Sequence, residues 1–208
     1  WRRAWSLKDH GKDYDAVFHD EHPDGFRWLV KSFGTNYRMT EMQSVIGLCE
    51  LDRIDSWNMP RRRRNAQILM DALRDVPQIL YLPVDTPERR NGWYVFPITL
   101  KMERMKCDIQ EFLEALGAEG APCWRVFWPQ CHTEQAYRQH NGFGNTGFPF
   151  RSKEYTNPAS VDYATVEVPN AEWHQDRTFI TFIFPTYEES HIQGIAKAIR
   201  KVIAAYAK

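Results

Sequence analysis

A long helical pattern that begins at residue 40 constrains this chain more than any other feature. Thr40 and Gln43 are spaced as a capping box, in which each side chain binds a backbone N–H of the other residue at a helix start. The apolar residues that follow recur at helical spacing and form a broad stripe: Met42, Val45, Ile46, Leu48, Cys49, Leu51 and Ile54. Pro60 is expected to interrupt or kink the helix, which resumes at residues 61–66 and stops near Pro77. So broad an apolar stripe needs a partner surface.

After residue 83 the pattern becomes that of a small mixed domain. Residues 93–100 are β-branched and aromatic and predict a strand, in which Pro97 favours an edge or a bulge. Further strands are expected at residues 121–128 and 179–183. The order is therefore a long connecting helix followed by a compact α+β unit with a small sheet.

Two helices of this second part carry start signals. Asp108, with Glu111 three residues later, predicts the cap of a short helix. Thr186 and Glu189 predict the cap of the last helix in the same way. The apolar face of that last helix consists of Ile192, Ile195, Ala196, Ile199, Val202 and Ile203. A further short helix is expected after Pro169.

The composition argues against several classes of function. The 27 basic and 27 acidic residues balance, so bulk charge supports neither a nucleic-acid partner nor a membrane-surface role. No apolar run approaches the ~20 residues that span a bilayer, and no signal-peptide pattern is present, so we expect a soluble, cytoplasmic protein. The cysteines are scattered without a CxxC and predict reduced thiols: Cys49, Cys107, Cys123 and Cys131.

The turn before the long helix is the first candidate site. It presents the amide of Asn36 beside the guanidinium of Arg38, just before a capped helix start. Amide donors, guanidinium groups and helix-end N–H groups all suit an anion such as phosphate. The alternative is that Asn36 is a turn residue tolerant of left-handed backbone and Arg38 a surface cation.

An aromatic stretch at residues 123–132 is the second candidate. Aromatic faces pack against the C–H faces of sugar or cyclitol rings, while His and Arg bind hydroxyl groups. Phe127, Trp128 and His132 are the candidate substrate residues; the alternative is a strand whose aromatic side chains pack in the core. Residues 139–168, rich in Gly, Asn, Ser and Pro, predict a long loop, and a loop of such length usually serves function.

Other motifs carry little chemistry. Four arginines at residues 61–64 point around more than half of a helix, and no wider basic stripe accompanies them, so we expect a solvated or interface face and no nucleic-acid site. His19 and His22 lie in a loop, and Cys131 and His132 are adjacent, so no metal site is predicted. The glycines of residues 142–147 do not have dinucleotide-binding spacing.

Several motifs together resemble one family, the DegT/DnrJ/EryC1/StrS pyridoxal-phosphate-dependent sugar and cyclitol aminotransferases. The run Gly34-Thr35-Asn36-Tyr37-Arg38-Met39-Thr40 is similar to the family's Gly-x-Asn-Tyr-Arg-Met-Thr segment. Three others match in family order and at about family spacing: Asp9-His10-Gly11, Trp128-Pro129-Gln130-Cys131-His132 and Pro169-Asn170-Ala171-Glu172. The resemblance covers essentially all 208 residues.

The resemblance implies a fold and a division of the chain. The fold class would be α/β, as the C-terminal portion of a fold-type I transferase with a long connecting helix and a small α+β domain. Residues 1–76 would form the end of the large domain and the connecting helix, and residues 77–208 the small domain. The family's Schiff-base lysine lies N-terminal to everything present, so this chain is expected to be part of a longer enzyme and to be inactive alone.

The resemblance also implies roles for residues. Asn36 would reach across a homodimer interface to the phosphate of the partner's pyridoxal 5'-phosphate, with Arg38 nearby. Tyr94 lies where many members have a His or Tyr and would line the substrate with Phe127, Trp128 and His132. The reaction implied is transfer of an amino group from glutamine or glutamate to a keto-sugar or keto-cyclitol.

Two other functions stay open from the sequence. A family member can lose catalysis and act as a regulatory or assembly protein. The small-domain fold can also serve as a free-standing binding module, against which the broad apolar stripe argues because it needs a partner.

Overall fold

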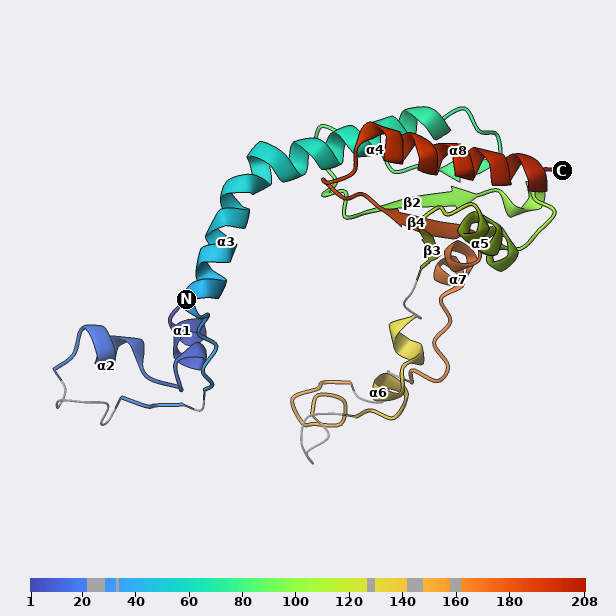
Figure 1. The fold of residues 1–208 in the computed structure, drawn as a ribbon. Helices are drawn as coiled ribbons and strands as arrows, with labels where there is room; N and C mark the ends of the chain where they lie inside the picture. Colours follow the sequence, from blue (N-terminus) through green and yellow to red (C-terminus); the bar gives the residue numbers. More distant parts are fainter. Residues whose placement is uncertain (22–28, 33, 127–129, 142–147, 158–161) are drawn as a thin grey trace. The chain divides into compact units, whose positions relative to one another are not determined.

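The structure is a computed structural model that divides into two compact units, Trp1–Asp55 and Ser56–Lys208 (Figure 1). It describes residues 1–21, 29–32, 34–126, 130–141, 148–157 and 162–208. The predicted domain boundary between residues 76 and 77 refers to a complete family member and stays a prediction. Among the described residues, no helix is long and apolar enough to cross a membrane.

The first unit contains three helices: α1 (Arg2–Lys8), α2 (Tyr14–Phe18) and α3 (Glu41–Arg53). The side chain of Asp13 caps α2 by accepting a hydrogen bond from the Ala16 N–H at 2.9 Å. The rings of Trp5 and Phe18 meet edge to face with centroids 5.3 Å apart, so an aromatic contact joins the two short helices.

Two glycines let two backbone segments of this unit touch. A Cβ atom on Gly34 would lie 2.3 Å from the Gly11 nitrogen, and one on Gly11 would lie 1.7 Å from the Ser32 carbonyl oxygen. Gly11 also has a φ of +80°, which disfavours any side chain. The close approach allows the Thr35 N–H to donate to the Leu7 carbonyl at 2.7 Å. The residues on either side of Asn36 are thereby fixed against the end of α1.

The predicted helix start at residue 40 is confirmed. The Gln43 N–H donates to Thr40 Oγ1 at 3.3 Å, and the Thr40 N–H donates to Gln43 Oε1 at 2.9 Å. The predicted interruption is confirmed as well: α3 is followed by a π-helical segment, η1 (Ile54–Asn58), and then by α4 (Met59–Leu73). Pro60 lies in the first turn of α4, where a missing N–H is tolerated.

The second unit is built on a four-stranded antiparallel sheet in the order β1-β2-β4-β3. Its strands are β1 (Ile79–Tyr81), β2 (Val95–Leu100), β3 (Cys123–Arg125) and β4 (Thr178–Phe182). Pro97 favours an edge or a bulge by sequence, and β2 as a whole is not an edge strand, because it lies between β1 and β4. Locally Pro97 is tolerated, because β1 pairs only with Thr99 and Leu100 and leaves the side of Pro97 free.

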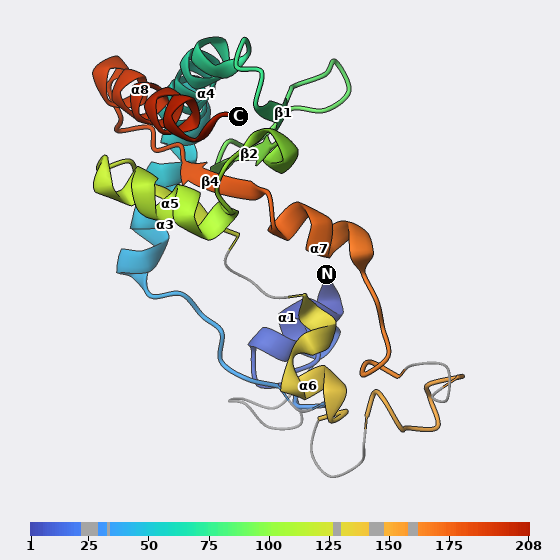
Figure 2. The ribbon, with the colours of Figure 1, turned by 90° about the vertical axis from the view of Figure 1, so that its right-hand side faces the viewer.

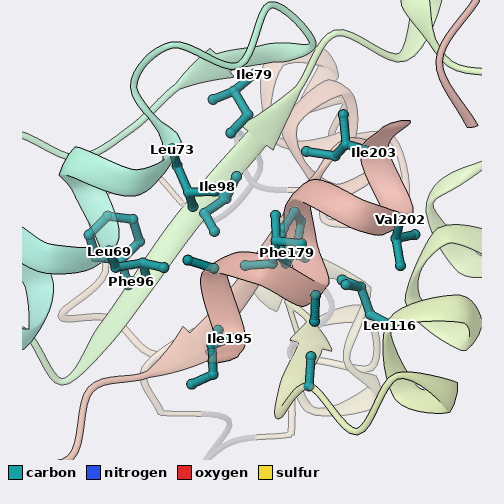
Figure 3. Close-up of a cluster of buried hydrophobic side chains, with 14 of the residues drawn as sticks. Leu69, Leu73, Ile79, Phe96, Ile98, Leu116, Phe179, Ile195, Val202 and Ile203 are labelled. Atoms are coloured by element: carbon teal, nitrogen blue, oxygen red, sulfur yellow. The ribbon is translucent and has the colours of Figure 1, made fainter. Parts of the chain in front are cut away.

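Helices cover one face of this sheet. The helices are α4, α5 (Ile109–Ala118) and α8 (Glu189–Tyr206), and α4 and α8 lie side by side over the strands (Figure 2). Figure 3 shows Phe96, Ile98 and Phe179 of the sheet among helix side chains. The predicted apolar stripe of the last helix is confirmed, because its members are all buried in this core: Ile192, Ile195, Ala196, Ile199, Val202 and Ile203.

The predicted cap of α5 is confirmed, while that of α8 is wrong. The Glu111 N–H donates to Asp108 Oδ1 at 2.9 Å. At α8 the N-cap is Glu188, whose N–H donates to His191 Nδ1 at 3.0 Å in a capping box. Thr186 lies in the preceding turn, too early in the chain to reach the first turn of the helix.

The segment after β3 contains little regular structure. A 3-10 turn, η3 (Cys131–Thr133), and a single helical turn, α6 (Gln135–Arg138), come first. The described part of residues 139–168 contains no helix or strand, as the loop prediction required. The short helix α7 (Pro169–Gln175) follows and leads into β4, which confirms the helix expected after Pro169.

Candidate functional site

Asp9 lies at the centre of a charged cluster in the first unit. Its side chain is 6% exposed, and its Oδ1 lies 3.4 Å from Lys12 Nζ. The same oxygen accepts a hydrogen bond from Arg38 Nη2. The backbone bridges Asp9 to Asn36 in an antiparallel pair. The His-Gly segment and the Asn-Tyr-Arg segment of the sequence are therefore one structural unit.

Among the described residues, the ion pairs of this cluster join two cations, Lys12 and Arg38, to the carboxylate of Asp9. Burial alone would raise the pKa of Asp9, but the hydrogen bond from Arg38 and the charges of Lys12 and Arg38 outweigh it and lower that pKa below its ordinary value. Asp9 is therefore ionised at neutral pH, and one carboxylate faces two cations. About half of the Arg38 side chain remains exposed, so its charge also acts on the surrounding solvent.

Asn36 presents its amide to solvent beside this cluster. The residue is exposed, and within the described ranges its side chain makes no hydrogen bond. The start of α3 has fewer N–H groups available to bind an anion than the sequence suggested, because the Thr40 side chain already binds the Gln43 N–H. The groups available to an anion are thus the Asn36 amide and the outer edge of the Arg38 guanidinium.

Tyr94, a predicted substrate residue in the second unit, is exposed. Its side chain is 63% exposed and lies just before β2. Its ring meets Phe182 of β4 edge to face, with centroids 5.3 Å apart. Trp124 of β3 also packs edge to face on Phe182, at 5.1 Å, and Phe184 stacks on it at 5.5 Å.

We call Tyr94, Trp124, Phe182 and Phe184 the aromatic patch. Sequence reasoning named Tyr94 but missed the other three as a group, because Trp124 lies on β3 whereas Phe182 and Phe184 lie at and just after the end of β4. The alternation of β4 contains a usable signal: Phe179 and Thr181 face the helices, so Phe182 faces the other side. The strand pairing is what brings the four rings together.

The remaining predicted substrate residues are placed only in part. Phe127 and Trp128 lie outside the described residues. His132 is half-buried in η3, and among described residues no hydrogen bond or ring contact joins it to Tyr94. A groove of about 540 Å³ lies between η3, α7 and the sheet. Cys131 and His174 line it, together with the Thr99 and Thr178 residues whose hydroxyl groups share a hydrogen bond of 3.0 Å.

The four consecutive arginines are solvated only in part: Arg63 and Arg64 are exposed, as a solvated face requires, whereas Arg61 and Arg62 are half-buried. Arg61 Nη1 donates to the Pro185 carbonyl at 3.3 Å, and Arg64 Nη2 donates to the Tyr187 carbonyl at 3.1 Å. Arg62 Nη1 donates to two carbonyl oxygens, as analysed below. These side chains bind the backbone of their own unit, a use that sequence spacing alone cannot distinguish from a surface patch.

The described residues give no support to metal or disulfide chemistry. They contain no group of three His, Cys, Asp or Glu side chains that could hold a metal ion. All four cysteines are free thiols. Burial raises the pKa of Cys123 to about 12, and a hydrogen bond with Thr181 opposes this only in part. A thiol with such a pKa is unreactive at neutral pH.

A comparison with known protein families shows to which family the chain belongs. The sequence profile of the DegT/DnrJ/EryC1/StrS aminotransferase family matches residues 1–163. The chain belongs to this family. The match includes the Asp9 cluster, Asn36 and the aromatic stretch at residues 123–132, so the family resemblance drawn from the motifs is confirmed.

Solved structures of aminotransferases share the fold. The aminotransferase from Psychrobacter cryohalolentis is 28% identical, with a TM-score of 0.73 over 99% of this chain and 49% of its own. PseC of Helicobacter pylori, 20% identical, has a TM-score of 0.68 over 97% of this chain and 45% of its own. The expected fold class, a portion of a family aminotransferase, is therefore confirmed.

This family member spans about half the length of the relatives that it matches. Among curated proteins, an uncharacterised protein of Methanocaldococcus jannaschii is 21% identical over 198 residues, which are 95% of this chain and 45% of that protein. What the whole protein does is accordingly inferred from the site and the family together.

Proposed function

We propose that the protein containing this chain is a pyridoxal-phosphate-dependent aminotransferase that transfers an amino group from glutamine or glutamate to a keto-sugar or keto-cyclitol. The observation that carries the proposal is the exposed amide of Asn36, which makes no hydrogen bond among the described residues, beside the Asp9 cluster and within the segment that the family profile matches. When bound, pyridoxal phosphate supplies the electron sink for amino transfer.

The described residues fit the phosphate of that cofactor. An amide donor and a guanidinium edge lie on one extended segment, and the buried carboxylate of Asp9 holds Arg38 in place. In the proposed arrangement Asn36 donates a hydrogen bond to a phosphate oxygen of the cofactor in the partner subunit of a homodimer. Arg38 and Lys12 contribute favourable charge, because two cations outnumber one carboxylate.

The aromatic residues of the second unit serve the substrate in this proposal. Tyr94, Phe127 and Trp128 pack against the ring of the amino acceptor, and His132 binds a hydroxyl group. Relatives support an acceptor of this class: PseC takes part in pseudoaminic acid biosynthesis, and the structure of DesI was determined in the presence of its TDP-sugar product. The exposed ring of Tyr94 is available for such a contact.

In this proposal the chain contributes only part of the active site. The lysine that holds the cofactor belongs to the half of the enzyme outside these 208 residues, so the chain alone does not catalyse transamination. Its own residues bind the phosphate, line the substrate and form much of the dimer interface. We propose a cytoplasmic location, since the free thiols suit a reducing compartment.

The test is an amino-transfer assay with the protein expressed from its complete gene. The protein is incubated with pyridoxal phosphate, with glutamine or glutamate, and with a panel of keto-sugars and keto-cyclitols, and aminated products are detected by mass spectrometry. Formation of one aminated product supports the proposal. If the complete protein binds the cofactor but aminates nothing, or lacks the lysine, the proposal is wrong and the regulatory alternative takes its place.

A further inference from the structure

Trp93, the residue before Tyr94, has an unusual backbone conformation. Its φ is +50°, a left-handed value that is unfavourable for a non-glycine residue. Its ring is 5% exposed and stacks on Phe96 of β2 at 5.6 Å, on the face of the sheet that the helices cover. Tyr94 packs on Phe182, which lies on the opposite face. The turn at Trp93 therefore sends two consecutive aromatic rings to opposite sides of the sheet.

Contacts around Trp93 must hold this conformation. Arg62 Nη1, from the first turn of α4, donates to the Trp93 carbonyl oxygen at 3.0 Å. The same nitrogen donates to the Ile183 carbonyl oxygen at 2.8 Å. Arg62 thus joins Trp93, two residues before β2, to Ile183, the residue after β4, because the start of β2 pairs with the end of β4.

The backbone of Tyr94 depends on the same junction. The Tyr94 carbonyl accepts from the Ile183 N–H at 3.3 Å, a long hydrogen bond that holds the strand ends together only weakly. Arg61 and Arg64 bind the loop after β4, at Pro185 and Tyr187, and among the described residues neither makes a hydrogen bond to Trp93. Of the arginines at residues 61–64, Arg62 is thus the one that the described hydrogen bonds connect to both strands.

We propose that Arg62 is the positioning residue for Tyr94: by holding the Trp93 and Ile183 carbonyl oxygens, it keeps the Tyr94 ring on the substrate side of the sheet. Arg62 does not touch substrate in this account and acts through Tyr94. The inference rests on the proposed substrate role of Tyr94.

Three variants of the complete protein test the inference. Arg62→Met keeps an unbranched apolar stem and removes the donors, whereas Arg62→Lys keeps a charged donor. Arg64→Met is the matched control, because it removes a guanidinium that binds a backbone carbonyl from the same helix but does not contact Trp93.

The first readout reports the position of Tyr94 without any substrate. The protein is labelled with 3-fluorotyrosine, and the fluorine resonance of Tyr94 is identified by its loss in Tyr94→Phe. We expect Arg62→Met to shift this resonance, because the Tyr94 ring loses its fixed edge-to-face contact with Phe182, and Arg62→Lys to restore most of the wild-type shift. Arg64→Met should leave the resonance in place. An unchanged Tyr94 resonance in Arg62→Met would overturn the inference.

The second readout is the KM for whichever acceptor is aminated in the assay above. Arg62→Met should raise this KM about tenfold, the effect of losing 1.4 kcal/mol of binding, with kcat little changed. In a Tyr94→Ala background the same substitution should change KM no further. Additive effects, or an unchanged KM in Tyr94→Ala while transfer proceeds, would overturn the inference and leave the aminotransferase proposal intact. If no acceptor is aminated, the proposed function fails, and the fluorine resonance still decides whether Arg62 positions Tyr94.

Discussion

Asp9 is a buried carboxylate whose charge depends on two cations, and this makes the first unit sensitive to acid. Its pKa is lowered in the folded state because Arg38 and Lys12 outweigh the cost of burial. The stabilisation is therefore fully present above the pKa of an unfolded Asp, about 3.9, and is lost as the pH falls through the folded pKa. We expect the protection of the amide hydrogens in residues 1–21, taken relative to the intrinsic exchange rate at each pH, to fall below about pH 4.

The matched variant for this prediction is Asp9→Asn. It removes the titrating group and leaves Arg38 without its partner. The amide protection of residues 1–21 should therefore already be lower at pH 7, and it should change less with pH. If acid lowers this protection equally in the wild type and in Asp9→Asn, Asp9 is not the group responsible.

Gly34 and Gly47 allow the same substitution to be compared in two settings. A Cβ atom on Gly34 meets backbone atoms of Gly11 and Leu7 at 2.3 and 2.7 Å, which cannot move away cheaply. We expect Gly34→Ala to destabilise the first unit by roughly 2 kcal/mol. Gly47 lies within α3 with the flexible end of Met39 at 3.9 Å, so Gly47→Ala should stabilise by about 0.5–1 kcal/mol. Urea denaturation measures both, and a similar effect of the two would contradict the close approach.

Helix α4 is fastened to the loop after β4 by a fully buried amide. Asn65 Nδ2 donates to the carbonyl oxygens of Phe184 and Tyr187, each at 3.0 Å. Asn65→Ala removes both bonds, although the Phe184 carbonyl keeps the Tyr187 N–H and the Tyr187 carbonyl keeps Arg64. We therefore expect a loss of about 2 kcal/mol in the free energy of unfolding, about 1 kcal/mol for each hydrogen bond. Gln67 lies on the same helix, and its side chain binds only Asp71 at the surface. Gln67→Ala should therefore lower the free energy of unfolding by about 0.5 kcal/mol or less. Thermal denaturation of the two variants compares them, and equal losses would refute the fastening.

Elements whose start depends on neighbouring residues could be predicted from the sequence. Thr40 and Gln43 are three positions apart, and so are Asp108 and Glu111, so the spacing alone defines both caps. The bonds of the arginines could not be predicted, because Arg62 and Ile183 are 121 positions apart. Thr186 failed as a cap because its place in the preceding turn follows from how the chain leaves β4, which local spacing does not contain.

The same limit applies to the candidate site. Asn36 and Tyr94 were found through motif and family resemblance, whereas the pairing of Arg38 with Asp9, 29 positions apart, needed the structure. The aromatic patch needed the strand order, since Tyr94, Trp124 and Phe182 come from three different segments. Contacts between residues that are far apart in the sequence can be identified only from the structure.

The exposed face of α3 tests whether the molecule forms the proposed dimer. The helix buries none of its residues in the structure, and the Leu51 side chain is 66% exposed. If this face lies in the dimer interface, Leu51→Asp should weaken dimerisation of the complete protein at least about tenfold, because burying a Leu contributes 1.5–3 kcal/mol. Val84, 52% exposed on the second unit, provides the control Val84→Asp. Analytical ultracentrifugation gives the dissociation constants, and equal values for the two variants would contradict this interface.

The cofactor affinity of Asn36→Ala tests the central claim most directly. Pyridoxal phosphate is titrated into the complete protein and its bound absorbance band is followed, with Met39→Leu, an exposed residue of the same segment, as the control. A hydrogen bond to a charged group contributes about 1.5–3 kcal/mol, so Asn36→Ala should weaken binding by roughly 10-fold to 100-fold, while Met39→Leu stays at the wild-type value. Equal affinity of Asn36→Ala and the wild type would contradict the assignment of Asn36 to the cofactor phosphate.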